Sequence, residues 1–137
     1  MEYKLYYIDC MPYALVYLEE FASWLDAQEN SLQLRALAHL ELLKERGPLL
    51  GRPYVDTLKG SQITNLKELR LQHKTEPIRI LFAFDPKQQA VIILGGSKQA
   101  DKRWYDVNMP LAEKRFREYL EKQRKADENA ARKEQEK

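Results

Sequence analysis

The stretch Leu58–Leu94 constrains the fold more than any other part of the chain, because two turn signals divide it into three apolar runs of strand length. The turn signals are the polar segment Gln72–Pro77 and the pair Asp85-Pro86, and the runs are Leu66–Leu71, Ile78–Phe84 and Ala90–Leu94. Strands that are joined by turns this short pair in antiparallel order. The sequence therefore predicts a three-stranded antiparallel meander.

Alternation within the meander separates an apolar face from a charged one. The second strand places its isoleucine and phenylalanine side chains on one side and Arg79 on the other. We expect the first turn to close so that Leu71 pairs with Ile78. Arg70 then lies directly across from Arg79, with Glu68 on the same face. Like charges that face each other destabilise a sheet by roughly 0.2–1 kcal/mol per pair, and an anion bound between them would offset this. Solvated arginines on an open face are the alternative.

Four motifs in and beside the meander carry a family resemblance. They are LKGS at Leu58–Ser61, LKELR at Leu66–Arg70, PIRILFAFD at Pro77–Asp85 and LGGSK at Leu94–Lys98, and the pair Trp104-Tyr105 follows them. In this order and spacing they resemble the HigB-like branch of the RelE/ParE toxin superfamily, from about Tyr3 to Leu120. The resemblance implies an α+β, RelE-like fold of order β-α-α-β-β-β-α. It also implies a ribonuclease that cuts mRNA, commonly on the ribosome, and a neutralising antitoxin, expected to be a helix-turn-helix protein.

The length of 137 residues suits one domain, and 44% of the residues are hydrophobic. We predict a toxin domain over residues 1–120. Residues 121–137 have no apolar periodicity and are predicted to be a solvated helix extension or a disordered tail. The net charge is only +2, but basic residues outnumber acidic ones between Arg52 and Arg103. A basic central segment is compatible with a polyanionic ligand.

Cysteine and histidine usage predicts no metal site and no disulfide. The chain has one cysteine, Cys10, so it cannot form a disulfide within itself. Its two histidines, His39 and His73, are not spaced as the ligands of a metal site. We therefore expect no metal and no cofactor. The N-terminus lacks the pattern of a signal peptide, and no window approaches the length of a membrane span. A cytoplasmic protein without a membrane partner is expected.

A helical hairpin is predicted ahead of the meander, after a first strand over Tyr3–Ile8. Pro12 suits a first helical turn, and apolar residues recur at helical spacing to about Ala27. The second helix is expected to begin at Asn30 or Ser31 and to stop at Gly47-Pro48. The stripe that it is expected to bury consists of Leu34, Leu37, Ala38 and Leu42.

The rest of the chain is predicted to form a loop over Leu49–Thr57 and a last helix that starts at Asn108 and Pro110. The apolar side of this helix consists of Leu111, Phe116 and Leu120. Gly95-Gly96 is interpreted as a turn that leaves the last strand, because the segment lacks the spacing of a phosphate-binding loop. We expect the helices to leave the arginine face exposed and to cover the face that carries Ile78, Ile80, Phe82 and Phe84.

RNA can be cut without a metal ion when the ribose 2′-hydroxyl attacks the adjacent phosphate, one group removes its proton, and another protonates the leaving 5′-oxygen. Cations stabilise the charge that builds on the phosphorane. Arg70 and Arg79 are planar forks suited to phosphate oxygens, and they match the arginines of the family. The other catalytic candidates are Glu68 as base or ion-pair partner, Tyr105 as proton donor or stacking residue, and Lys98. The candidates for RNA binding are Lys59, Lys67, Lys102, Arg103 and Trp104.

Two other classes of function remain open at this point. Some relatives poison DNA gyrase and cut nothing, so the chain could be a protein-binding toxin on the same fold. An accessory protein of a phage or mobile element is the second possibility. The combination of clustered cations with a carboxylate and a tyrosine favours the ribonuclease.

Overall fold

The structure is a computed structural model that describes residues 12–99, 101 and 103–136. The predicted strand over Tyr3–Ile8 lies outside the described residues. Along the chain the elements are β1 (Leu15–Tyr17), α2 (Glu19–Asp26), α3 (Asn30–Arg46), the 3-10 turn η1 (Gly47–Leu49), β2 (Val55–Thr57), β3 (Lys67–His73), β4 (Glu76–Phe84), β5 (Ala90–Ser97) and α4 (Arg103–Gln135).

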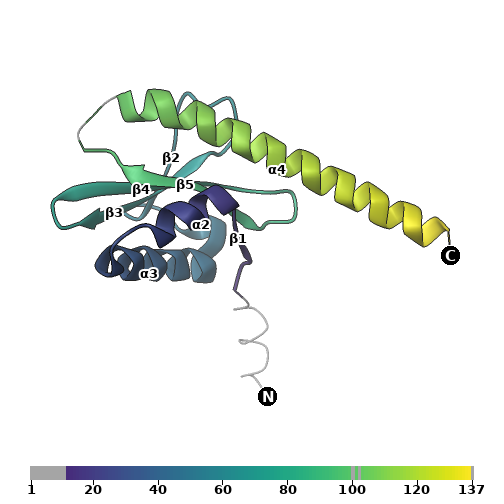
Figure 1. The fold of residues 1–137 in the computed structure, drawn as a ribbon, viewed down its shortest axis with the longest axis horizontal. Helices are drawn as coiled ribbons and strands as arrows, with labels where there is room; N and C mark the ends of the chain where they lie inside the picture. The colour runs from purple at the N-terminus through teal and green to yellow at the C-terminus, as the bar shows by residue number, and fades with distance from the viewer. Residues whose placement is uncertain (1–11, 100, 102, 137) are drawn as a thin grey trace, which may run out of the picture.

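A five-stranded mixed sheet of order β1-β5-β4-β3-β2 forms the middle layer of this α+β fold. β3, β4 and β5 form the predicted antiparallel meander, and Leu71 pairs with Ile78 as expected. β1 adds to β5 in parallel and β2 adds to β3 in antiparallel order, so each edge gains a short strand. α2 and α3 cover one face of the sheet, and α4 crosses the other (Figure 1).

The two faces of the sheet carry separate apolar clusters. Ile78, Ile80 and Phe82 are buried under α2 and α3, which confirms the predicted helix-covered face. On the opposite face, Leu81 and other residues of β4 and β5 pack against Ala112 and Phe116 of α4. The expectation that the arginine face is open was therefore wrong, because α4 covers part of it.

The first predicted helix is wrong in its first half, where Leu15–Tyr17 forms β1. The pairing of β1 with β5 is completed at both ends, because Ala90 N–H donates to the carbonyl of Ala14 and Leu18 N–H donates to that of Ile92. The helix α2 begins only at Glu19, where two glutamates in its first turn complement the helix dipole. A strand partner far along the chain outweighed the local helical spacing.

α3 has the predicted bounds but buries a neighbouring stripe. The predicted core residues Leu34 and Leu37 are 69% and 44% exposed. Leucines occur on more than one side of this helix, so the sequence offers two competing apolar stripes. The side that packs against the sheet consists of Leu32, Ala36, Leu40 and Leu43.

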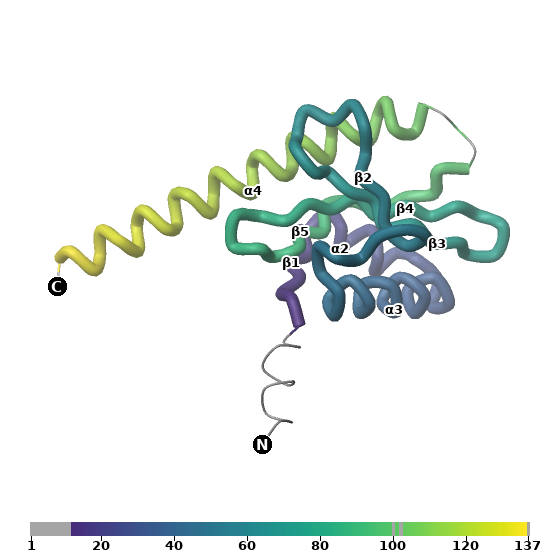
Figure 2. The backbone as a smooth tube through the Cα atoms, turned by 180° about the vertical axis from the view of Figure 1, so that it is seen from behind, coloured from purple at the N-terminus to yellow at the C-terminus, as the bar shows by residue number. Residues whose placement is uncertain are grey.

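α4 begins earlier than predicted, at Arg103, and contains Pro110 inside the helix. Phe116 is buried as expected, whereas Leu111 is exposed. Beyond Glu121 the helix continues to Gln135 as a solvated extension past the edge of the sheet (Figures 1 and 2). None of the described helices combines the length and the apolar composition that a membrane span requires.

The segment predicted as the loop Leu49–Thr57 contains β2, which buries Val55 against the core. Gly95 and Gly96 lie inside β5, so the prediction of a turn there was also wrong. A Cβ atom on Gly95 would lie 2.5 Å from the ring of Trp24, and one on Gly96 would lie 3.1 Å from Nε1 of Trp104. The two glycines therefore let two tryptophan rings pack directly onto β5.

Candidate functional site

The register of the sheet places two arginines side by side. Arg70 of β3 pairs with Arg79 of β4, as predicted, and Arg79 pairs in turn with Gly96 of β5. Glu68 lies on the same face of β3, two residues before Arg70. Because Gly96 has no side chain, the indole of Trp104 can pack against the strand beside Arg79. The start of α4 thereby closes over the arginine.

Arg79 is buried, with an exposed fraction of only 7%, whereas the sequence predicted an exposed side chain. Its Nη1 donates to the carbonyl of Ile78 at 2.9 Å. Its Nε is enclosed and has no hydrogen-bond partner among the described residues. Oε2 of Glu68 lies 3.8 Å from this nitrogen, which is an ion pair beyond hydrogen-bonding distance. Arg79 nevertheless lines a groove, and a guanidinium whose hydrogen bonding is incomplete is suited to bind an anionic acceptor such as a phosphate oxygen there.

Glu68 is the carboxylate shared by this cluster, and it is 6% exposed. Its Oε1 lies 3.8 Å from Nε of Arg70. Its Oε2 accepts a hydrogen bond of 2.6 Å from the hydroxyl of Tyr105. Two arginines thus share one carboxylate, and Lys98 lines the same groove as both arginines, so the cluster has an excess of positive charge.

Tyr105 links α4 to the charged face of the sheet. Burial raises the pKa of Tyr105 to about 12, the hydrogen bond to Glu68 acts in the same direction, and Arg79 acts against it. The hydroxyl is therefore protonated at neutral pH and acts as the donor to Glu68. Nζ of Lys98 lies 5.4 Å from the centre of the Tyr105 ring, in cation–π range. The ring of Trp104 packs edge-on at 5.1 Å.

Arg70, Arg79 and Lys98 of this cluster open into a groove with a volume of about 710 Å³, whereas Glu68 and Tyr105 do not line it. It is lined by Arg35, His39, Pro53, Tyr54, Arg70, Leu71, Gln72, Pro77, Arg79 and Lys98. Arg35 and His39 on α3 and Tyr54 ahead of β2 are lining residues that were not predicted from the sequence. Their only sequence signal is a basic pair one helical turn apart, and nothing local places α3 beside β3. No carboxylate is among these described lining residues.

The remaining predicted RNA-binding residues are dispersed. Lys67 points to the opposite face of β3 from Glu68, because neighbouring residues of a strand alternate. Lys59 is exposed in the loop between β2 and β3, and it does not line the groove. Arg103 is exposed at the start of α4. Lys102 lies outside the described residues.

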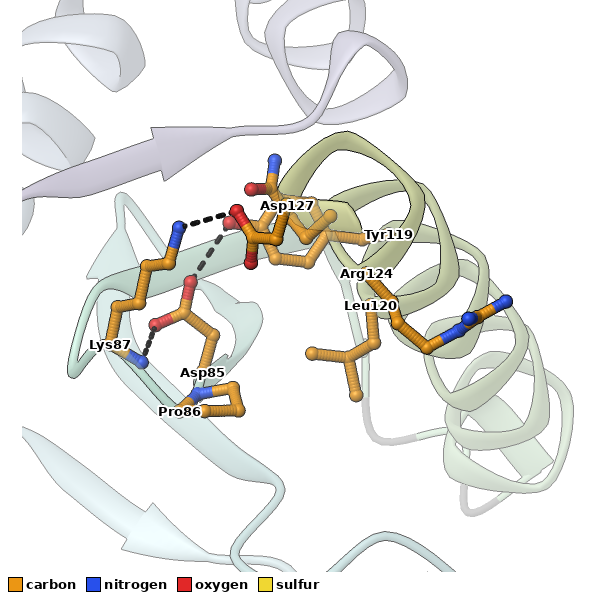
Figure 3. Close-up of a pocket in the computed structure, with 8 residues that line it drawn as sticks. Asp85, Pro86, Lys87, Tyr119, Leu120, Arg124 and Asp127 are labelled. Atoms are coloured by element: carbon orange, nitrogen blue, oxygen red, sulfur yellow. Dashed lines mark hydrogen bonds and ion pairs between the residues drawn. The ribbon is translucent and has the colours of Figure 1, made fainter. Parts of the chain in front are cut away.

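A smaller cavity of about 300 Å³ lies where α4 passes the turn between β4 and β5 (Figure 3). The buried carboxylate of Asp85 accepts hydrogen bonds from the hydroxyl of Tyr119 and from the backbone N–H of Lys87 and of Gln89. Nζ of Lys87 pairs with Asp127 at 3.1 Å. Because protein donors already satisfy Asp85, its contacts serve to join α4 to the turn between β4 and β5.

Comparison with known proteins places the chain in a family. The phage-derived Gp49-like proteins (DUF891) match residues 23–117, a range that contains the whole charged cluster. The chain belongs to this Gp49-like family. A Mycobacterium tuberculosis protein named "Putative toxin HigB3" is 42% identical over 108 residues, which are 78% of this chain and 93% of that protein. The resemblance to HigB-like proteins is confirmed.

Two further similarities complete the comparison. "Putative toxin HigB2" of the same organism is 41% identical over 106 residues, which are 75% of this chain and 52% of that protein. A solved structure of a mutant of the E. coli toxin RelE in the free state has a TM-score of 0.48 and 13% identity. That match covers 69% of this chain and 92% of the RelE chain. It carries no information about activity.

Proposed function

We propose that this protein is the toxin of a type II toxin–antitoxin system and that it cleaves mRNA on the ribosome without a metal ion. The observation that carries the proposal is the incompletely satisfied, buried Arg79 beside Arg70 and Lys98, with Glu68 as their shared carboxylate. An excess of positive charge in a partly enclosed site suits the phosphorane through which RNA cleavage passes. The family relationship supports the same activity, because two relatives are named as HigB toxins.

In the proposed mechanism, Arg70 and Arg79 hold the scissile phosphate with their planar guanidinium groups. Glu68 is too enclosed to meet the ribose directly, so it acts through Tyr105. As the 2′-oxygen attacks phosphorus, it gives its proton to the hydroxyl oxygen of Tyr105, and Tyr105 passes its own proton to Glu68 Oε2, 2.6 Å away. A raised pKa keeps Tyr105 protonated and ready for this relay.

The bond between phosphorus and the 5′-oxygen then breaks. Lys98 stabilises the charge on the leaving oxygen, which takes a proton from water. The hydroxide that this leaves takes back the proton held by Glu68, through Tyr105, so both side chains return to their starting state. The products are a 2′,3′-cyclic phosphate and a free 5′-hydroxyl. In this scheme every step uses side chains of the chain itself and water.

Arg70→Ala is the sharpest test, because this side chain is 39% exposed and its loss leaves the core unchanged. Losing one charge contact to the transition state should slow cleavage on the order of 10²–10³-fold. Stability should change by only about 0.5 kcal/mol or less. The measurement combines primer extension on a defined mRNA with growth assays and thermal melting. Lys125→Ala on the exposed α4 extension is the control. An Arg70→Ala protein that melts and cleaves like the parent removes Arg70 from the mechanism.

Arg79 needs a conservative variant because its side chain is buried. Arg79→Ala would leave Glu68 enclosed with one cation fewer, and it should lower the free energy of unfolding by about 1–3 kcal/mol. Lost activity in that variant could then reflect a lost fold. Arg79→Lys keeps the charge but loses the fork, so we expect a folded protein whose cleavage is slower by about tenfold or more. If Arg79→Lys cleaves at the parental rate, the planar guanidinium group of Arg79 is not needed for cleavage.

The proposed partner is a small helix-turn-helix antitoxin. The groove carries cations and suits an acidic antitoxin segment. Co-expression with the product of a neighbouring gene should yield a complex that survives purification. Arg70→Ala should weaken this complex only if the antitoxin covers the groove. The absence of a complex with any neighbouring gene product would count against a toxin.

A further inference from the structure

One wall of the groove plays no part in the chemistry above. It consists of Arg35, His39 and Tyr54, and it belongs to the same continuous groove as the two paired arginines. We propose that this wall binds an unpaired RNA base next to the scissile phosphate, stacked on the ring of Tyr54. The inference rests on the proposed function, because it takes the RNA backbone to lie on Arg70 and Arg79.

Tyr54 is held at a fixed position relative to the arginines. Its carbonyl accepts a hydrogen bond of 2.7 Å from the backbone N–H of Arg70, so the aromatic residue and the proposed phosphate-binding residue are joined directly. Its ring packs edge-on against His39, with 6.1 Å between the ring centres and 65° between the planes. Tyr54 nevertheless stays 41% exposed. An exposed aromatic ring beside a cationic track is an arrangement by which proteins bind single-stranded RNA bases.

His39 and Arg35 add polar groups beside that ring. Nδ1 of His39 lies 2.9 Å from the carbonyl oxygen of Arg35. A carbonyl can only accept, so Nδ1 carries the hydrogen and Nε2 is an acceptor when the ring is neutral. The guanidinium of Arg35 supplies donors only. The wall therefore offers both kinds of hydrogen-bonding group for a base edge or an adjoining phosphate.

The size and charge of the groove favour RNA as its occupant. Its volume of about 710 Å³ falls within the range of about 300–1,000 Å³ of pockets that hold small molecules, so it has room for a nucleotide beside the phosphate. Arg35, Arg70, Arg79 and Lys98 supply the cations. An acidic antitoxin segment would also match this charge, but it would not require an exposed aromatic ring.

The test uses a short single-stranded RNA with a deoxyribose at the cleavage position, so that it binds without being cut. The fluorescent base aminopurine stands beside that position, and stacking quenches its fluorescence. Tyr54→Ala should lose the quenching and bind on the order of ten- to a hundredfold more weakly. Tyr54→Phe and Tyr54→Trp should keep both, because they keep an aromatic face.

Tyr17→Ala is the matched control. Tyr17 is also 41% exposed and also packs edge-on against one ring, that of Phe21 at 5.5 Å, but it does not line the groove. It should leave affinity and quenching unchanged. Thermal melting of each variant identifies a loss of fold, and Tyr54→Leu replaces Tyr54→Ala if the alanine variant does not fold.

Cleavage of mRNA on the ribosome is measured in parallel, so that a failure of the proposed subsite can be told apart from a failure of the proposed function. If the parent cleaves mRNA while Tyr54→Ala keeps parental affinity and quenching, the subsite is overturned and the proposed function stands. If quenching depends on Tyr54 in a protein that never cleaves RNA, the subsite stands and the proposed function fails. A parent that does not bind the RNA overturns the subsite. The subsite is also overturned if Tyr54→Ala binds the RNA like the parent and loses only the binding of an acidic antitoxin peptide.

Discussion

At the scale of single residues, the site is built around an electrostatic conflict between Arg70 and Arg79. Like charges that face each other across a sheet cost roughly 0.2–1 kcal/mol. Glu68 lies 3.8 Å from the Nε of each arginine and offsets part of this cost. Buried charges with incomplete hydrogen bonding are rare in protein interiors. In the proposed mechanism, the phosphate bound by the two guanidinium groups offsets the rest of this cost.

Tyr105 gives a prediction about pH. Its pKa is about 12 in the folded protein, against an ordinary value of 10.0. Because the folded state holds the phenolic proton more tightly, the resulting stabilisation is fully present below about pH 10 and is lost as the pH rises through about 12. The ultraviolet absorbance of phenolate, followed as the pH is raised, should therefore increase less near pH 12 in Tyr105→Phe than in the parent. An unchanged titration curve would contradict the burial of this hydroxyl.

Tyr119 is a control for Tyr105, because its pKa is likewise raised to about 12 by burial and by its hydrogen bond to Asp85 (Figure 3). The two tyrosines should nevertheless differ in their effect on the cleavage rate. Tyr105→Phe removes the proton relay and should slow cleavage by roughly 10²–10⁴-fold. Tyr119→Phe should lose the same kind of late titration and cleave like the parent. The relay fails if both variants cleave equally well in primer extension.

At the scale of elements, the features predicted correctly from the sequence are those that depend on the residue pattern of one continuous stretch. The meander and the pairing of Arg70 with Arg79 follow from alternation and one short turn, both of which lie within a single stretch. The burial of Arg79 does not follow from that stretch, because it depends on α4 packing over Gly96. The strand β1 and the buried stripe of α3 likewise depend on partners that are distant in sequence. The groove wall at Tyr54 was missed for the same reason.

The two glycines of β5 test this packing. Alanine at Gly96 would place its Cβ 3.1 Å from Nε1 of Trp104 and should shift the start of α4, so it should reduce cleavage more than stability. Alanine at Gly95 would place its Cβ 2.5 Å from Trp24 and should cost about 1–3 kcal/mol of stability. Gly51→Ala is the control, because no atom lies within 4 Å of its added Cβ. Melting and primer extension are measured together. Parental cleavage by Gly96→Ala would show that Trp104 does not position the site.

At the scale of the whole molecule, α4 extends well past the sheet (Figure 2). Arg124 pairs with Glu121 and Glu128 within the extension itself. The ion pair between Lys87 and Asp127 links it back to the turn between β4 and β5. The extension adds no apolar surface to the core, so we propose that the domain ends near residue 120.

We therefore expect a chain that ends at Leu120 to fold and to cleave mRNA at close to the parental rate. Its melting temperature should fall by a few degrees at most, because the exposed ion pairs that it loses contribute little. Circular dichroism melting and primer extension provide the measurement. A truncated chain that is unfolded, or folded but inactive, would show that the extension belongs to the functional domain.

Salt dependence tests whether the groove, rather than the whole molecule, attracts RNA. The net charge of the chain is only +2, whereas four cationic side chains line the groove. For single strands the logarithm of affinity falls with that of salt concentration by about 0.7 per neutralised phosphate, so three or four contacts predict a slope of roughly −2 to −3.

Arg70→Ala should make this slope shallower by about 0.7. Tyr54→Ala should lower the affinity at every salt concentration without changing the slope, because stacking releases no counterions. Lys125→Ala should change neither quantity. Binding of the uncleavable RNA over a salt series provides the measurement, and equal slope changes in Arg70→Ala and Tyr54→Ala would show that the groove recognises charge alone.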